Sequence, residues 1–179
     1  MKRKVLALIT GSMLVSSLGF AAPISNSAPG DTTIGYSHFS LSHSNDNDDF
    51  YLEHALSDKF TLGIEQNNNT VRGNGNGNTT DVYAQYKVDP NIRLILGNRN
   101  YDYGPVDNKV FYGIGANTNL GPKLDGYASV ITNSTTTEWQ AGVNYALSQQ
   151  LGLNLGYKSS KDKNYLTYDG IGIGVNYKF

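Results

Sequence analysis

Residues 170–179 read GIGIGVNYKF, and this stretch decides the fold. The odd-numbered positions from 171 to 179 hold only aliphatic or aromatic side chains, whereas the even-numbered positions hold Gly, Asn or Lys. Successive side chains of a β-strand point to opposite faces of the sheet. The stretch therefore predicts a strand with one face in an apolar medium and the other face in a polar one.

The same alternation runs through the chain from residue 32 onward, where no segment has the period of an amphipathic helix. The first segment changes parity, because Ile34 and Tyr36 share one face and Phe39 and Leu41 share the other, which predicts a β-bulge near Ser37. Eight strands are the alternative if the first or seventh segment is not a strand. We predict ten strands, over residues 32–43, 49–56, 60–68, 79–88, 92–101, 109–118, 123–133, 136–147, 151–159 and 165–179.

The connections between these segments alternate in length. Short ones fall at residues 56–59, 89–91, 119–122 and 148–150, and longer or more polar ones at 44–48, 67–78, 102–108, 133–135 and 160–164. Two of the short ones share a pattern, since HALSDKF at 54–60 matches YALSQQL at 145–151. Tight turns at one end and polar loops at the other are typical of a transmembrane antiparallel up-and-down β-barrel.

Composition excludes several other classes. The 179 residues suit one domain, and the chain lacks the second run of about 20 apolar residues that a bundle of membrane-spanning helices needs. The absence of cysteine excludes a disulfide scaffold and a thiolate zinc site. A formal net charge of -1 gives no basic surface for nucleic acid.

The first 21 residues predict a secretory signal peptide. Lys2, Arg3 and Lys4 precede the apolar stretch 5–15, and the small-x-small site 19–21 favours cleavage after Ala21. Cleavage would remove three of the 14 basic residues and none of the 15 acidic ones, which leaves a net charge of -4. We expect residues 22–31 to be an N-terminal periplasmic tail and residues 32–179 to be the barrel.

The C-terminal residues also carry a family resemblance. The chain ends in an aromatic residue, Phe179, with another aromatic, Tyr177, two positions before it and Gly174 five before it. This pattern resembles the assembly signal of small outer-membrane β-barrel proteins of Gram-negative bacteria, the opacity-protein-like and porin-like superfamily. That superfamily usually has a polar residue where this chain has Gly172. The resemblance implies an outer-membrane location, recognition by the barrel assembly machinery, surface loops and no cofactor.

Parity divides the strands into a lipid face and a lumen face. The lumen face is rich in Gly, Asn, Gln and Tyr and carries five acidic and five basic residues. A soluble β-sandwich would instead expose its charged face to open solvent. The predicted polar and charged lumen residues are Glu53, Glu65, Asp81, Tyr83, Gln85, Lys87, Arg93, Arg99, Asp125, Glu138, Gln140, Asn144, Asn154, Lys158, Asn176 and Lys178.

The tight turn at 89–91 sets the register of its hairpin. It predicts an ion pair between Asp81 and Arg99, and a Tyr83 ring that fills the space above Gly97. It also brings two basic residues, Lys87 and Arg93, together. The full set of predicted pairs is Asp81 with Arg99, Tyr83 with Gly97, Gln85 with Ile95 and Lys87 with Arg93.

Large aromatic residues on the lipid face predict the two membrane interfaces. Tyr86, Tyr145 and Tyr177 fall near the tight turns, and Trp139 and Tyr157 fall near the loops.

Two polar clusters are candidates for chemistry. His38 and Ser40 share a strand face, and outer-membrane lipid A deacylases use His, Ser and Glu on a barrel's outer face. Because the sequence fixes no carboxylate beside them, we interpret them as polar residues at the membrane interface. The acidic stretch 44–49 lacks the EF-hand spacing, so we interpret it as a solvated loop and predict no metal site.

Ten strands enclose little more than the eight whose interior side chains just fill. We therefore expect a nearly closed lumen and a structural or surface-interaction role without catalysis, in a monomer that contacts outer-membrane lipid and binds no nucleic acid. The first alternative is a narrow porin-like pore for small solutes. The second is an enzyme that modifies lipids of the outer leaflet.

Overall fold

Each alternating segment forms a strand that pairs with its neighbours in sequence. The computed structural model describes residues 22–71, 75–102, 108–162 and 167–179. Within these ranges the one helical element is the 3-10 turn η1 (Ser42–Ser44). The strands are β1 (Thr32–Leu41), β2 (Asn45–Ala55), β3 (Phe60–Val71), β4 (Gly75–Asp89), β5 (Ile92–Tyr101), β6 (Lys109–Gly121), β7 (Leu124–Thr132), β8 (Thr136–Ala146), β9 (Leu151–Asp162) and β10 (Thr167–Lys178).

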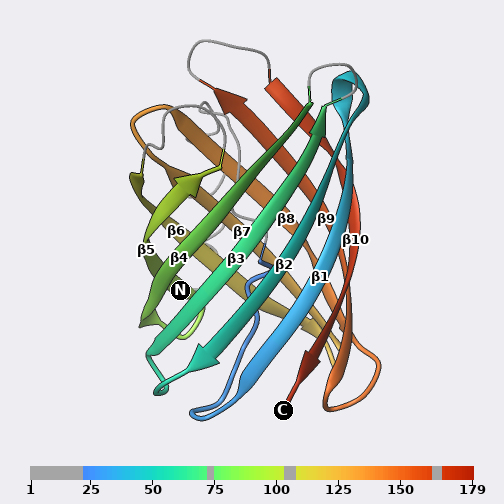
Figure 1. Cartoon of the computed structure of the whole chain (residues 1–179). Coiled ribbons are helices and arrows are strands. Elements are labelled where there is room, and N and C mark those ends of the chain that lie inside the picture. Colours follow the sequence, from blue (N-terminus) through green and yellow to red (C-terminus); the bar gives the residue numbers. More distant parts are fainter. Residues whose placement is uncertain (1–21, 72–74, 103–107, 163–166) are drawn as a thin grey trace, which may run out of the picture.

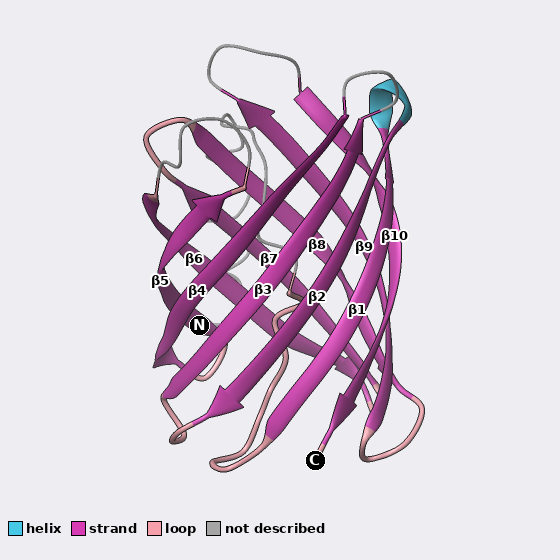
Figure 2. Cartoon of the chain, in the orientation of Figure 1, coloured by secondary structure: helices cyan, strands magenta, loops and turns pink. Residues whose placement is uncertain are grey.

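The ten strands close into an antiparallel up-and-down barrel (Figures 1 and 2). Strand β10 pairs with β1, so every strand has two neighbours and no sheet edge is left open. The prediction of ten strands, including the first and the seventh, is confirmed. In the described ranges no helix is long and apolar enough to span a membrane.

The tight turns and the C-terminus lie at one end of the barrel, at the bottom of Figure 1. The repeated Ala-Leu-Ser motif makes the same turn twice: Ser57 Oγ accepts the Phe60 N–H at 3.1 Å, and Ser148 Oγ accepts the Leu151 N–H at 2.9 Å. We call this end the turn end and the opposite end the loop end.

The predicted register of the β4–β5 hairpin is confirmed at all four pairs. The predicted β-bulge in β1 is wrong, because β1 pairs with β2 without a shift from Thr32 to Leu41. Phe39 and Leu41 face the lumen and are buried. The parity change in β1 comes from an aromatic residue in the lumen, where Phe39 lies over Gly172 of β10.

Four strands, β2, β3, β4 and β9, extend further toward the loop end than the alternation predicted. Strand β2 begins at Asn45 and β3 and β4 pair as far as Val71 and Gly75, within segments predicted as loops. These extensions hold almost only polar residues, so they carry no period-two signal. Strand β4 has 15 residues, whereas a tilted strand spans a bilayer with about 9–11. The barrel wall therefore rises beyond the apolar belt.

Buried aromatic rings in the lumen lie opposite glycines on a neighbouring strand. A Cβ atom added to such a glycine would clash with the ring. Each ring can therefore lie there only because the residue opposite it is a glycine. The prediction that Tyr83 covers Gly97 is wrong: Tyr83 leans toward its other partner, Gly63, and Phe111 of β6 covers Gly97. The pairs are Tyr51 with Gly35, Tyr83 with Gly63, Phe111 with Gly97, Tyr127 with Gly142 and Phe39 with Gly172.

Candidate functional site: the barrel lumen

An ion-paired cluster on three strands fills the loop-end half of the lumen. The Arg99 guanidinium donates from Nε to Asp81 Oδ1 at 2.7 Å and from Nη1 to Glu138 Oε1 at 2.6 Å. Arg99 is 2% exposed, and its guanidinium lies 5.6 Å from the centre of the Phe111 ring. The forked guanidinium thus bridges β4, β5 and β8 across the interior.

A second cluster, on β2, β3 and β9, lies in the same half beside the first. Lys158 Nζ of β9 donates to Asn47 Oδ1 at 2.6 Å and to Asp49 Oδ2 and Asn67 Oδ1 at 3.3 Å each. The ammonium also lies 5.2 Å from the centre of the Phe39 ring. Lys158 is 1% exposed, so its charge is held by protein groups.

The turn-end half holds a chain of polar contacts. Glu53 Oε1 accepts from Tyr83 Oη at 2.9 Å and from Gln85 Nε2 at 2.6 Å. Arg93 Nη1 donates to Gln85 Oε1 at 2.9 Å, and Nη2 donates to Asn117 Oδ1 at 2.8 Å. These contacts answer the predicted closeness of Lys87 and Arg93, because the Arg93 guanidinium donates to amide oxygens on both neighbouring strands.

A network of uncharged groups lies on the wall formed by β7, β8 and β9. The Tyr127 hydroxyl accepts from Gln140 Nε2 at 2.9 Å and from Asn154 Nδ2 at 3.0 Å. Asn154 Nδ2 also donates to Asn144 Oδ1 at 2.9 Å. This network continues the packing of the lumen toward the turn end.

Residues before β1 occupy the remaining space in the turn-end half. The Ala22 N–H donates to Glu65 Oε2 at 3.0 Å, and Ala22 and Ile24 pack in one apolar cluster with Tyr51, Tyr83, Ile95, Phe111, Tyr127 and Ile131. Residues 22–31 were expected to be a periplasmic tail, but the first residues of this segment lie inside the barrel. Figure 1 shows it rising from the turn end into the barrel.

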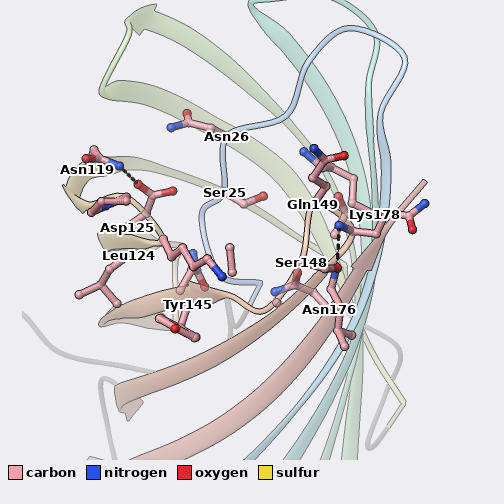
Figure 3. Close-up of a pocket in the computed structure, with 18 residues that line it drawn as sticks. Ser25, Asn26, Asn119, Leu124, Asp125, Tyr145, Ser148, Gln149, Asn176 and Lys178 are labelled. Carbon is pink, nitrogen blue, oxygen red and sulfur yellow. Dashed lines mark hydrogen bonds between the residues drawn. The ribbon is translucent and has the colours of Figure 1, made fainter.

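A shallow cavity of about 190 Å³ opens at the turn end, beside this segment (Figure 3). Ser25 and Asn26 form one side of it, and the turn-end residues of β6 to β10, together with Thr33 of β1, form the rest. Asn119 donates to Asp125 at 3.0 Å on its rim. Nearby, Lys178 Nζ lies 3.2 Å from Asp31 Oδ2. A hydrogen bond from the Ala28 N–H lowers the pKa of the Asp31 carboxyl group.

The outer surface of the barrel is an apolar belt. Side chains such as Leu96, Val110 and Ile171 are more than half exposed there, while charged groups lie buried inside. A closed barrel with an apolar exterior and a polar interior is the architecture of proteins of the bacterial outer membrane. The chain is a small transmembrane β-barrel.

Comparisons with known proteins concern the fold of this barrel. No protein-family model matches the sequence, and no curated protein does. Among solved structures, the KdgM porin is 15% identical with a TM-score of 0.49, over 82% of this chain and 99% of that one. A de novo designed transmembrane β-barrel is 16% identical (TM-score 0.47; 87% and 100%), and the N-terminal barrel domain of Pseudomonas aeruginosa OprF is 12% identical (TM-score 0.47; 86% and 100%).

The structure brings most of the predicted lumen residues together in the interior. Five lie near the turn end and are partly exposed: Lys87, Asp125, Asn144, Asn176 and Lys178. The other eleven are buried: Glu53, Glu65, Asp81, Tyr83, Gln85, Arg93, Arg99, Glu138, Gln140, Asn154 and Lys158.

The aromatic residues predicted for the interfaces point outward. Tyr86, Tyr145 and Tyr177 lie exposed toward the turn end. Trp139 and Tyr157 lie toward the loop end, with their ring centres 5.1 Å apart. Gly174 and Phe179 lie on and just beyond β10, and Phe179 exchanges two backbone hydrogen bonds with Thr32, each of 2.9 Å.

The acidic stretch 44–49 was predicted as a loop, but from Asn45 onward it is part of β2. Asn47 and Asp49 face the lumen and hold Lys158, whereas Asp46 and Asp48 face outward. Asp48 Oδ1 accepts from Tyr36 Oη at 2.6 Å and lies 2.9 Å from His38 Nδ1. Within the described ranges no group of three or more acidic or histidine residues is arranged to hold a metal ion.

Sequence reasoning missed two sets of lumen residues. Asn47 lies in a segment predicted as a loop, and Asp49 and Asn67 lie at the loop-end limits of predicted strands, where the neighbouring residues are mostly polar. Ala22 and Ile24 lie in a segment without secondary structure. The signal that could have found the second set is Ile24 itself, an aliphatic residue in an otherwise polar tail.

Proposed function

We propose that the chain is a closed outer-membrane barrel with a structural or surface-presenting role, and that it neither conducts solutes nor catalyses a reaction. The observation that carries this proposal is the burial of the lumen charges, with Glu65 and Asp81 at 0% and Lys158 at 1% exposure. In a water-filled pore these charges would be hydrated. Here protein groups replace the water.

Energetics favour a permanently packed lumen. A buried charge costs several kcal/mol unless it is paired and hydrogen-bonded, and the outcome depends on good geometry. Arg99 meets this condition with bonds to two carboxylates, and Lys158 meets it with three oxygen acceptors. Opening a pore through this half would break these contacts together.

The wall beyond the apolar belt supports the surface role. The loop ends of β2, β3 and β4 are rich in Asn, Asp and Thr and pair along their whole length. Such a rim presents a rigid polar surface on the outside of the cell if the turn end faces the periplasm. Outer-membrane barrels have that orientation, with short periplasmic turns and longer outer loops.

The proposed assembly of the barrel uses its C-terminal strand. Gly174, Tyr177 and Phe179 would be read by the barrel assembly machinery before β10 closes on β1. Gly174 also has a structural role, because a side chain there would meet Ser37 and the Tyr36 carbonyl. We expect the assembled barrel to be a monomer in outer-membrane lipid.

Planar-bilayer recording of the purified full-length protein tests the proposal. We expect no stable channel openings at either polarity. A steady open level in most insertions would favour the alternative of a narrow pore and overturn the proposal.

A second candidate function comes from the outer face of β1 and β2. Asp48 supplies the carboxylate that the sequence did not fix, at 2.9 Å from His38, and Ser40 faces outward two residues from His38. A nucleophile needs a base within hydrogen-bond reach, and Ser40 Oγ instead donates to Asp46 at 3.4 Å. Mass spectrometry of lipid A from cells with the wild-type protein, the Ser40→Ala variant or neither decides this candidate, which requires a mass change lost in S40A.

A further inference from the structure

Residues 22–27 have no regular secondary structure, yet the start of this segment is among the most buried parts of the molecule. Ala22 and Ile24 are each 1% exposed. Their neighbours are the aromatic rings that lie over the wall glycines, including Tyr51, Tyr83 and Phe111. The segment thus fills space that the strands leave open.

Polar contacts from three strands fix the backbone of this segment. The Ala22 N–H donates to Glu65 Oε2 of β3 at 3.0 Å. Arg93 Nη1 of β5 donates to the Ser25 carbonyl at 3.1 Å, and Asn144 Nδ2 of β8 donates to the Ile24 carbonyl at 3.2 Å. These groups satisfy backbone atoms that a segment outside any sheet would otherwise bury unpaired.

A tight turn directs the segment into the barrel. The Ala28 N–H donates to Asp31 Oδ2 at 2.9 Å, and the Asp31 N–H donates to the Ala28 carbonyl at 3.0 Å. Gly30 has φ +91°, a conformation that favours glycine, and its N–H donates to the Ala55 carbonyl at 2.7 Å. The chain therefore reverses at the turn end, between the lumen segment and β1.

The predicted cleavage site ends at Ala21, so cleavage there would make the buried Ala22 nitrogen the mature N-terminus. The amide N–H would become an ammonium group with three donors, in hydrogen-bond contact with a carboxylate of 0% exposure. A hydrogen bond between two charged groups is about twice as strong as one between neutral groups.

We infer that the mature chain begins at Ala22, after removal of the signal peptide, and that Glu65 binds its α-ammonium group inside the lumen. Residues 22–27 then form a plug that belongs to the chain itself. This inference deepens the proposed closed lumen and rests on it. The plug closes the turn-end half, and the cavity beside Ser25 and Asn26 lies next to it.

The test starts with the full-length precursor expressed in a bacterial host and purified from outer membranes. The intact mass should correspond to residues 22–179. The folded protein is then treated with an amine-reactive ester, and labelling of the Ala22 α-amine is followed by mass spectrometry of the N-terminal peptide. We expect this labelling to be at least about tenfold slower than in the heat-unfolded protein, because it requires local opening.

Two matched variants assign the protection to Glu65. Glu65→Gln should restore fast labelling, whereas Glu138→Gln, which changes a buried carboxylate of the loop-end half, should keep it slow. A different starting residue, or fast labelling of the folded wild-type α-amine, would overturn the inference. Equal labelling of E65Q and wild-type protein would overturn the role of Glu65.

Conductance separates this inference from the proposed function. Deletion of residues 23–27 should leave the protein non-conducting, because the Arg99 and Lys158 clusters still close the loop-end half. A wild-type protein that conducts contradicts the closed lumen, whatever its labelling. A closed wild type with a rapidly labelled N-terminus contradicts the plug alone.

Discussion

The two halves of the lumen are closed in different ways. At the loop end, side chains of the wall itself meet across the interior, with Arg99 between two carboxylates and Lys158 between three oxygen acceptors. At the turn end, residues 22–25 lie on aromatic rings. One hydrogen bond to the Glu65 carboxylate and one each from Arg93 and Asn144 hold them. Closure at the loop end follows from strand register, whereas closure at the turn end depends on a segment that could leave without unpairing a strand.

The largest effect should come from the loop-end half. Arg99→Met leaves Asp81 and Glu138 buried without their shared cation, and breaking a buried pair costs about 3–5 kcal/mol. Urea unfolding of the barrel in lipid vesicles measures the loss. Lys87→Met, at a partly exposed site near the turn end, is the control and should cost much less. Equal losses would mean that the loop-end cluster is hydrated.

Phe111→Ala should have the next largest effect, because this ring lies where the two halves meet. It covers Gly97, packs in the cluster with Ala22 and Ile24, and lies beside Arg99. Truncating a buried Phe typically costs about 3–5 kcal/mol, and we expect the lower end here. The control is Tyr112→Ala, whose side chain faces lipid. A larger loss of stability in Y112A than in F111A, in the same urea assay, would contradict this prediction.

Gly115→Val should have a smaller effect on stability and act on the turn-end half alone. A side chain at Gly115 would meet Ile24, and overpacking of this kind costs about 1–3 kcal/mol. We expect faster labelling of the N-terminal amine and an unchanged strand content by circular dichroism. Gly121→Val is the control, since nothing lies within 4 Å of a Cβ there. Unchanged labelling in G115V would argue against contact between Ile24 and the wall.

The smallest effect should come from the outer face. Tyr36→Phe removes the bond to Asp48, and a net hydrogen bond contributes about 0.5–1.5 kcal/mol. We expect the lower end of that range, because Asp48 keeps its contact with His38. A loss in Y36F that approaches that of R99M would show that polar contacts outside the lumen matter as much as those inside.

Much of this architecture could be predicted from the sequence where one face of a strand is apolar. Period-two alternation located the ten strands, and one tight turn fixed the pairing of Asp81 with Arg99. The alternation failed in β1 because Phe39 is an aromatic residue in the lumen, and an aromatic side chain does not reveal which face it occupies. It also failed beyond the belt, where Asn47 has polar residues on both faces around it.

The direction of a side chain was harder to predict than its register. Tyr83 has a glycine opposite it on each neighbouring strand, and pairing alone does not say toward which one the ring leans. The plug was missed for a different reason. Residues 22–25 follow no repeating pattern, and their place depends on space left by Tyr51, Tyr127 and other residues distant in sequence.

Thiol accessibility tests the closed lumen most directly, because the chain has no cysteine of its own. Ser37→Cys places a single thiol on the lumen face of β1 at a residue of 1% exposure, and Ser148→Cys places one in an exposed turn. Each folded variant in lipid vesicles is treated with a small charged methanethiosulfonate. We predict that S148C reacts readily and that S37C stays unmodified until the barrel is unfolded. Comparable reaction rates of the two folded variants would mean that water fills the lumen, and would contradict the account.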